Sequence, residues 1–291
     1  MADTLTRPGP PAPATAAPRH RRRAGGTRWA LRLVAVLYVL ALVALPVVSV
    51  VQHTFADGVG PVLDVLTSEK FLAAARLTAV VAGLAVVLNT VFGVGMALLL
   101  TRYRFRGRRL LGAIIDLPVS ISPIVVGVAL ILVYGTYGWF GPALQEAGIR
   151  VIFAVPGMVL ATVLVSLPLV LREVAPTLEE AGLEQEQAAQ SLGASAWQRF
   201  WRITLPTIRW ALAYGVALSL ARSLGEFGAV RVVSGSVSGR SQTLTLFVND
   251  SYQEFGADAQ RAAFAAAFVL MTVAVVLIVV IAALRPKEEK S

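Results

Sequence analysis

The chain has 291 residues, of which 56% are hydrophobic and only 15% are charged, and its mean hydropathy is +0.71. This composition excludes an ordinary soluble domain, because several windows exceed the roughly 20 apolar residues that cross a bilayer. The absence of cysteine excludes disulfides, thiolate catalysis and cysteine metal sites, and the two histidines, His20 and His53, do not suggest a metal site. We therefore expect an all-α, polytopic membrane protein without a metal.

Residues 1–28 are rich in Pro, Ala and Arg, and five of the arginines lie between positions 19 and 28. This composition cannot bury a core, so it predicts a disordered basic tail. The apolar run at 29–51 could belong to a signal peptide. However, it is longer than the roughly 7–15 apolar residues of such peptides, and no clear A-x-A cleavage site follows. We interpret it as an uncleaved first span.

Five further apolar windows are long enough to cross a membrane, which predicts six spans with both termini on one side. The windows cover residues 72–101, 110–134, 155–171, 207–233 and 262–284, and residues 285–291 form a C-terminal tail. Most Lys and Arg residues lie in the tails, the 102–109 loop and the 172–209 segment. The positive-inside rule places these parts in the cytoplasm. Topology thus explains the net charge of +9, and nucleic-acid binding is not expected, because aromatic residues are not interleaved with the basic clusters.

Several polar residues lie within the second and third windows. Asp116, Ser120 and Ser122 accompany two prolines at the start of the third span, where freed backbone groups suit the lining of a cavity. We expect Asp116 to cap a helix at the cytoplasmic interface, and the two serines either to line a solute pathway or to bond back to carbonyls. Asn89, deep in the second span, is expected to bond a neighbouring helix.

The segment from Gln187 to Pro206 is polar and aromatic and lies between long hydrophobic stretches. Gly193 suits a left-handed helix stop, and Ser195, followed three residues later by Gln198, forms a capping box. The sequence therefore predicts a hinge and a second short helix that starts at Ser195. Pro206 suits the first position of the next apolar helix, where its missing N–H costs nothing.

A second capping box, formed by Thr177 and Glu180, predicts that the helix before this hinge covers about 178–192. Two interpretations compete for the segment as a whole. It could lie on the bilayer as an amphipathic helix, which Trp197 and Trp201 would suit. Alternatively, its apolar surface is held away from lipid and is covered by a partner protein.

Arg222 and Glu226 lie four residues apart in the fifth window, on one predicted helical face. Isolated charges inside a membrane are costly, so the two side chains are expected to interact. A structural ion pair and a polar gate in a translocation pathway both fit this pattern. The 234–261 connection on the opposite side is too long for a tight turn and predicts a short surface helix or strand.

The chain lacks the means to bind ATP by a phosphate-binding loop. It contains no GxxxxGK[ST] motif, and none of its three lysines follows a glycine. Any use of ATP must therefore come from a partner subunit, and no cofactor is expected in this chain.

The pattern AA-x3-G-x9-I-x-LP before the fifth span resembles the cytoplasmic EAA loop of type I ABC importer permeases. Three other stretches resemble the sulfate/thiosulfate permeases, and most closely their W-type subunit: IIDLPVSISPIVVG (114–127), VPGMVLATVLVSLPLVLREVAPTL (155–178) and ARSLGEFGAVRVVSGS (221–236). The resemblance covers about residues 30–285. It implies that the residues that couple the chain to an ATPase are Glu186, Gln187, Ala188, Ala189, Gly193, Ala194, Ser195, Ile203, Leu205 and Pro206.

The resemblance also implies a set of partners. These are a T-type permease as the other half of a heterodimer, two ABC ATPase subunits that bind ATP, and an extracytoplasmic sulfate- or thiosulfate-binding protein. The expected location is the bacterial cytoplasmic (inner) membrane, and the chain itself is expected to catalyse no covalent chemistry. A molybdate or tungstate permease is the alternative. An intramembrane enzyme would need paired acids or a Ser/His pair. A passive channel would not need the coupling segment, residues 177–206.

One position departs from the family pattern. The family usually has Glu directly before the paired alanines, and the resemblance implies that this Glu meets an Arg of the ATPase. Here that position is Gln187, and Glu186 precedes it. Glutamine keeps a hydrogen bond but not the charge, and Glu186 points about 100° around the helix. Whether Glu186 replaces the missing carboxylate is left open by the sequence.

Overall fold

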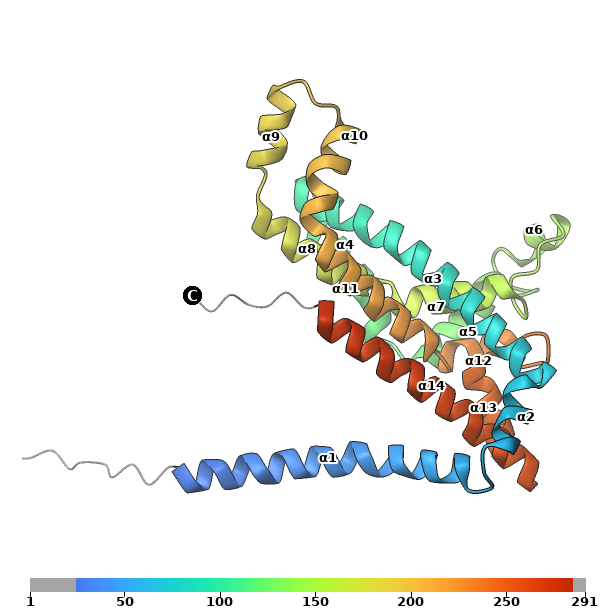
Figure 1. Ribbon diagram of the computed structural model, residues 1–291. Coiled ribbons are helices and arrows are strands. Elements are labelled where there is room, and N and C mark those ends of the chain that lie inside the picture. Colours follow the sequence, from blue (N-terminus) through green and yellow to red (C-terminus); the bar gives the residue numbers. More distant parts are fainter. Residues whose placement is uncertain (1–24, 285–291) are drawn as a thin grey trace, which may run out of the picture. The chain divides into compact units, whose positions relative to one another are not determined.

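The computed structural model describes residues 25–284, so most of the predicted basic tail and the whole C-terminal tail, residues 285–291, lie outside the described range. The chain divides into two units, Met1–Val48 and Ser49–Ser291. Within the described residues every regular element is a helix (Figure 1), which confirms the predicted all-α class.

The first unit contains most of helix α1, Gly25–Phe55, which includes the residues of the predicted first span, 29–51. Its apolar part, Trp29–Phe55, has 27 residues. At 1.5 Å per residue it is about 40 Å long, more than the roughly 30 Å of a bilayer's hydrocarbon core.

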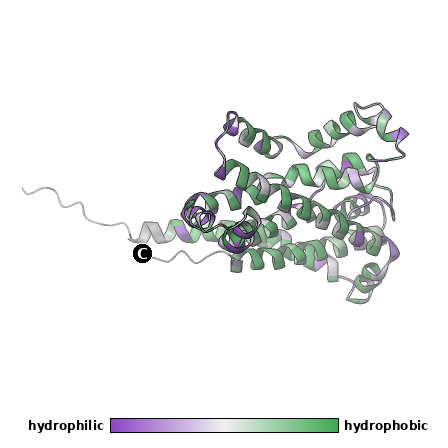
Figure 2. Ribbon diagram, turned by 90° about the horizontal axis from the view of Figure 1, so that it is seen from above, coloured by the Kyte–Doolittle hydropathy of each residue, from purple (hydrophilic) through white to green (hydrophobic). Residues whose placement is uncertain are grey.

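Three of the four long apolar helices found among the described residues belong largely to the second unit. They are α3, Glu69–Arg102, the helix Ala196–Leu224, whose main part is α11, and α14, Ala257–Leu284. Two bent helix pairs are also long and apolar enough to cross a membrane if each pair is counted as one span. The division into six spans therefore stays a prediction. Figure 2 shows hydrophobic residues along the long helices and hydrophilic residues mainly at their ends and in the connections.

The first bent pair covers the predicted third span at 110–134. Helices α4, Arg108–Ser120, and α5, Pro123–Tyr134, meet at an angle of 111°, so the span is not one helix. Pro123 cannot donate a backbone hydrogen bond, and Ser122 before it has the extended backbone that a following proline favours, with φ −57° and ψ 133°. The second pair, α7, Val155–Ser166, and α8, Pro168–Ala181, bends by only 40°.

A tight core forms where α3, α8 and α11 pack together. Val170, Val174, Leu178 and Ile208 are fully buried there. Gly93 of α3 permits this close packing, because a Cβ atom at that position would lie 2.7 Å from the Cβ of Val170. The core holds the ends of α3, α8 and α11 together at the place where the predicted coupling segment begins.

The predicted fifth span, 207–233, is interrupted. Helix α11, Leu205–Leu224, ends before a break at 225–227, and α12, Gly228–Ser234, then packs on α5 and α7. The 234–261 connection contains helix α13, Leu244–Gln253, which agrees with one of the two predicted possibilities.

Different short helices lie at the two ends of the second unit. The short helices α9, Glu184–Ser191, and α10, Ala196–Arg199, lie at the end where α3 and α14 finish and α11 begins (Figure 1). The short helices α2, Gly60–Thr67, and α6, Gly141–Glu146, lie with α13 at the other end. The coupling segment and the last described residues of α14 are thus at one end.

Candidate functional site

The predicted hinge is a helical hairpin formed by residues 184–204. Gly193 has φ +85°, and the N–H groups of Gly193 and Ala194 each donate at 2.9 Å to carbonyls of α9. Ser195 then starts α10. Its hydroxyl accepts from the N–H of Gln198, and the Gln198 side chain accepts from the N–H of Ser195. The glycine stop and the capping box are both confirmed.

Helix α10 continues into the membrane span without a gap. A π-helical turn, Phe200–Thr204, joins it to α11, and Pro206 is the second residue of α11. Pro206 therefore does not begin a separate helix, which corrects the expectation, and the π turn changes the hydrogen-bond register just before this residue without an N–H. The hairpin therefore has one arm that is continuous with the span.

The expected cap at Thr177 is wrong. Helix α8 passes through this residue, whose hydroxyl donates to the carbonyl of Glu173 at 3.4 Å. The helix ends instead near Gly182, which has φ +68°. The predicted helix 178–192 is consequently split between α8 and α9. Burial of Leu178 in the core outweighs the local capping pattern.

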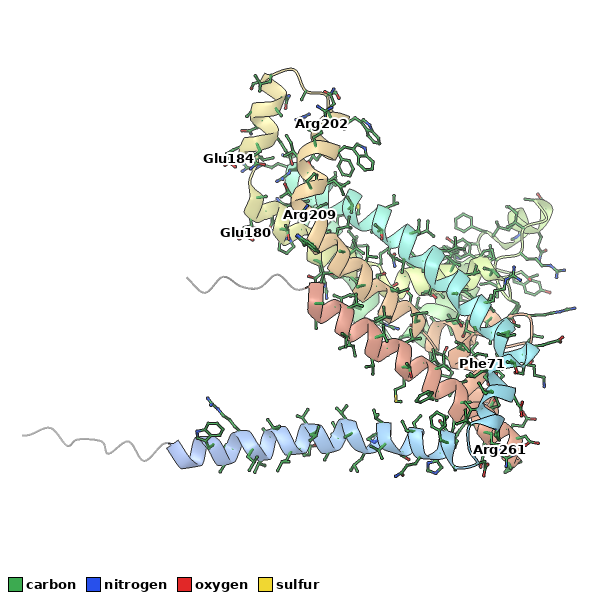
Figure 3. The ribbon with its side chains drawn as sticks, viewed as in Figure 1. Phe71, Glu180, Glu184, Arg202, Arg209 and Arg261 are labelled. Atoms are coloured by element: carbon green, nitrogen blue, oxygen red, sulfur yellow. The ribbon has the colours of Figure 1, made fainter. Side chains whose placement is uncertain are left out.

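The outer surface of the hairpin carries exposed apolar side chains among polar ones. Trp197 and Trp201 meet edge to face with ring centroids 5.4 Å apart, and they are 70% and 49% exposed. Leu192, at the turn, is also exposed, as is Gln187 on α9. Figure 3 shows Arg202 at this end of the molecule. Of the other predicted coupling residues, some are exposed (Ala188, Gly193, Ser195, Pro206) and some partly buried (Ala189, Ala194, Ile203, Leu205).

Glu186 points into the protein. Its Oε1 accepts from Arg102 Nη2 and from the hydroxyl of Thr204, both at 3.0 Å. Arg102 also donates through Nη1 to the carbonyl of Leu178 at 2.9 Å. No sequence motif distinguishes Arg102, which is one of five arginines between positions 102 and 109, or Thr204. Only the fold brings these side chains to Glu186.

The predicted pathway residues lie at two breaks in the spans, and the structure brings these breaks together. Ser120 ends α4 and Ser122 precedes α5, and both are exposed. Gly228 at the start of α12 lies against Pro123, since a Cβ on Gly228 would be 3.0 Å from the Cβ of Pro123. Ser122 and the 225–227 break are therefore close in space.

Arg222 and Glu226 form the ion pair that their spacing suggested, with Nη1 and Oε2 2.6 Å apart. They are not on one helical face, because α11 ends at Leu224 and Glu226 lies in the break. The other oxygen of Glu226 accepts from the N–H of Ala229 at 2.8 Å and so caps α12. The Glu226 side chain is 2% exposed, whereas that of Arg222 is 36% exposed. This supports the structural ion pair, while the guanidinium still faces outward in part.

Two other polar residues have partners on neighbouring helices. Asp116 lies inside α4 and does not cap it, which corrects the expectation; its Oδ1 lies 3.0 Å from Nη2 of Arg172 on α8. Asn89 donates to the hydroxyl of Ser166 at 2.8 Å, which confirms the predicted bond to a neighbouring helix.

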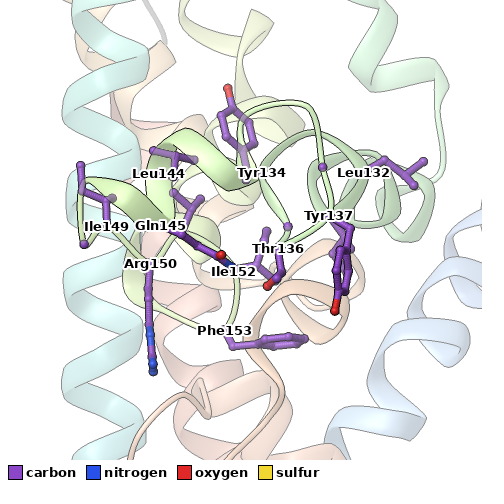
Figure 4. A pocket seen from close by; sticks show the side chains of 16 residues that line it. Leu132, Tyr134, Thr136, Tyr137, Leu144, Gln145, Ile149, Arg150, Ile152 and Phe153 are labelled. Atoms are coloured by element: carbon purple, nitrogen blue, oxygen red, sulfur yellow. The ribbon is translucent and has the colours of Figure 1, made fainter.

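A cavity of about 880 Å³ lies in the connection between α5 and α7, away from the hairpin (Figure 4). Tyr134, Thr136, Gln145 and Phe153 are among its lining residues. None of the predicted pathway residues lines it. Within residues 25–284, no group of three or more His, Asp or Glu side chains is placed to hold a metal ion.

Asp250 of α13 organises the connection at the same end as this cavity. Its carboxylate accepts from Arg231, Ser236, Gln242 and Asn249. Burial acts to raise the pKa of Asp250, but these four hydrogen bonds together hold it below the ordinary value of 3.8. The 236–242 loop is thereby tied to α13.

Comparison with known proteins places this architecture in a family. Residues 89–290 match the family described as binding-protein-dependent transport system inner membrane component. The sulfate transport system permease protein CysW of Synechocystis sp. is 47% identical over 252 residues, which cover 87% of this chain and 90% of that protein. The sulfate transport system permease protein CysT of Escherichia coli is 37% identical over 221 residues, with 76% and 80% covered.

The fold also matches that of solved transporters. The crystal structure of a bacterial ABC transporter involved in the import of the acidic polysaccharide alginate aligns with a TM-score of 0.70 over 89% of this chain and 93% of that chain, at 19% identity. At that identity the likeness concerns the fold alone. The chain is therefore a membrane-embedded permease and not an enzyme, and it belongs to the binding-protein-dependent transport system inner membrane components, together with the CysW permeases of sulfate transport systems.

Proposed function

We propose that this chain is the W-type permease subunit of an ATP-driven importer for sulfate or thiosulfate. The relatives that it matches at 40–47% identity include CysW permeases of sulfate transport systems, which favours sulfate over the molybdate or tungstate alternative. The observation that carries the role in an ABC importer is the exposed aromatic hairpin, continuous through its π turn with a long apolar helix. An uncovered apolar surface of this kind fits a docked subunit.

The proposed assembly contains a T-type permease, two ABC ATPase subunits and an extracytoplasmic binding protein. ATP binds to the ATPase subunits. The hairpin and both termini face the cytoplasm of a bacterium, in keeping with the distribution of Lys and Arg. Gln187, Trp197 and Trp201 lie on the exposed side of the hairpin, where an ATPase subunit can reach them.

Transport then follows an alternating-access cycle. ATP shifts the population of inward- and outward-facing states by its different affinity for them. Ser120, Ser122 and Arg222 lie at the two adjoining breaks and would line the anion path. Because Glu226 partly neutralises Arg222, this arginine attracts a sulfate ion without trapping it. An Arg222→Ala variant with unchanged sulfate uptake would contradict this role.

Sulfate-stimulated ATP hydrolysis in proteoliposomes tests the function. The complete complex would be reconstituted with its binding protein, and thiosulfate and molybdate would be added as competitors. Stimulation by sulfate that thiosulfate reduces is the expected result. Stimulation by molybdate alone would keep the architecture and overturn the substrate.

A pair of glycine variants tests whether the hairpin takes part. Gly193→Trp places a bulky residue at the hairpin turn, where φ is +85° and nothing lies within 4 Å of an added Cβ. Gly107→Trp is the matched control, because Gly107 has φ +93° and equally open surroundings but lies outside the hairpin. Only the Gly193 variant should lose sulfate stimulation. Equal losses in both variants would argue against the proposed role of the hairpin.

A further inference from the structure

We infer that Glu186 is a positioning residue that links the hairpin to the membrane spans through Arg102 and Thr204, and that it does not contact the ATPase. This inference rests on the proposed function. It concerns how movement of the hairpin reaches the spans.

The link begins with Arg102, the last residue of α3. Helix α8 ends at Ala181, and the chain turns at Gly182, so the carbonyl of Leu178 lies in the last turn of α8. Arg102 Nη1 donates to this carbonyl, while Nη2 of the same guanidinium reaches Glu186 on α9. One side chain of α3 therefore holds both sides of the joint between α8 and α9.

Thr204 adds the second arm of the hairpin. It is the last residue of the π turn, and its hydroxyl donates to the same oxygen of Glu186 that Arg102 contacts. Glu186 thus connects α9, α3 and the start of α11.

Burial makes this link persistent. The side chains of Arg102 and Glu186 are only 11% and 16% exposed, and Thr204 is 4% exposed. A buried charge that loses its partner is strongly unfavourable, so the pair stays closed when the hairpin moves. A second ion pair at the same end, between Arg108 and Glu179, is 3.1 Å long but 40% and 60% exposed, and water can replace it.

The presence of Gln187 in place of the family's usual Glu fits an inward role for Glu186. Gln187 occupies the outward position on α9, and the carboxylate of the neighbouring residue is turned inward and already has two donors. A carboxylate that is already bonded to Arg102 and Thr204 is poorly placed to form an ion pair with an arginine of another subunit. The contact with the ATPase subunit would then be made by the amide of Gln187 and by Trp197 and Trp201.

The test measures sulfate taken up per ATP hydrolysed in the complete reconstituted complex. Glu186→Gln and Arg102→Gln remove one charge each, and Thr204→Val removes only a hydroxyl. Arg108→Gln is the matched control. Because the link carries a coupling free energy, Glu186→Gln and Arg102→Gln should lower the ratio by about 5-fold or more, Thr204→Val by less, and Arg108→Gln should leave it unchanged. ATP hydrolysis itself should continue.

The ratio separates this role from a merely structural one, because a destabilised chain yields fewer intact complexes without changing sulfate per ATP in those that remain. A native ratio in Glu186→Gln would overturn the inference. So would loss of the ATPase from purified Glu186→Gln complexes while Arg102→Gln complexes retain it, since Glu186 would then be the ATPase contact. If the charge variants do not assemble, Thr204→Val decides by the same ratio. Failure of sulfate to stimulate the native complex would instead refute the proposed function.

Discussion

The close approach of α3 and α8 at Gly93 predicts an unusual response to alanine. A Cβ atom at Gly93 would lie 2.7 Å from Cβ of Val170, 2.9 Å from its Cγ1 and 3.1 Å from the backbone nitrogen of Leu171. Val170 is fully buried between helices and cannot move aside. Overpacking of this kind costs about 1–3 kcal/mol.

Alanine at other glycines of α3 should instead stabilise the folded protein. At Gly83 and Gly95 an added Cβ meets nothing within 4 Å, and both residues are exposed. Alanine there gains about 1 kcal/mol of helix propensity. Alanine gains the same propensity at Gly93, so only the overpacking separates the two variants, and we expect Gly93→Ala to be about 1–3 kcal/mol less stable than Gly83→Ala.

Thermal unfolding in detergent, followed by tryptophan fluorescence, measures this difference. At about 2–4 °C per kcal/mol, the transition of Gly93→Ala should lie at least about 2 °C below that of Gly83→Ala, with Gly95→Ala as a second control. Equal transitions for Gly93→Ala and the two controls would refute the close helix contact.

Two further predictions concern the ends of the second unit. Ser195→Ala removes the capping box and should cost about 1 kcal/mol, so the amide of Gln198 should exchange hydrogen about 5-fold faster, whereas Ser191→Ala should leave it unchanged. Equal exchange rates of the Gln198 amide in the two variants would show that Ser195 does not cap α10. The lowered pKa of Asp250 means that its stabilising effect is present above about pH 3.8 and is lost as the pH falls through its folded value. Protection of residues 236–242 in hydrogen exchange, corrected for intrinsic rates, should fall as the pH drops below about 3.8, and Asp250→Asn should abolish that change. A native pH profile in the variant would count against this assignment.

Local signals in the sequence were sufficient for the membrane class and for the hairpin turn. Hydropathy over about 20 residues identifies a span without any knowledge of its neighbours. The stop at Gly193 and the box at Ser195 involve residues at most a few positions apart, so their geometry is encoded where it occurs. The motif around them also led to the family, which the comparisons confirm.

The same local reasoning failed where packing over longer distances decided the outcome. Thr177 has a good capping pattern, yet α8 continues through it because Val174 and Leu178 are buried on both sides of it. The 111° bend at Ser122 follows from a proline that the sequence displays, but its angle depends on how α5 packs with α12. A proline indicates where a helix is interrupted and not how far it turns.

The amino-acid sequence is enough to identify the class of protein and the position of the hairpin, since hydropathy, caps and motif spacing are properties of neighbouring residues. The direction of Glu186 depends on the complete fold, because its partner Arg102 is 84 positions away and is one of five nearby arginines. The fold also decided that Glu226 caps α12 and is not on one helical face with Arg222. The complete fold sets which charged side chains lie close together and how deeply they are buried, and these two factors determine which ion pairs form.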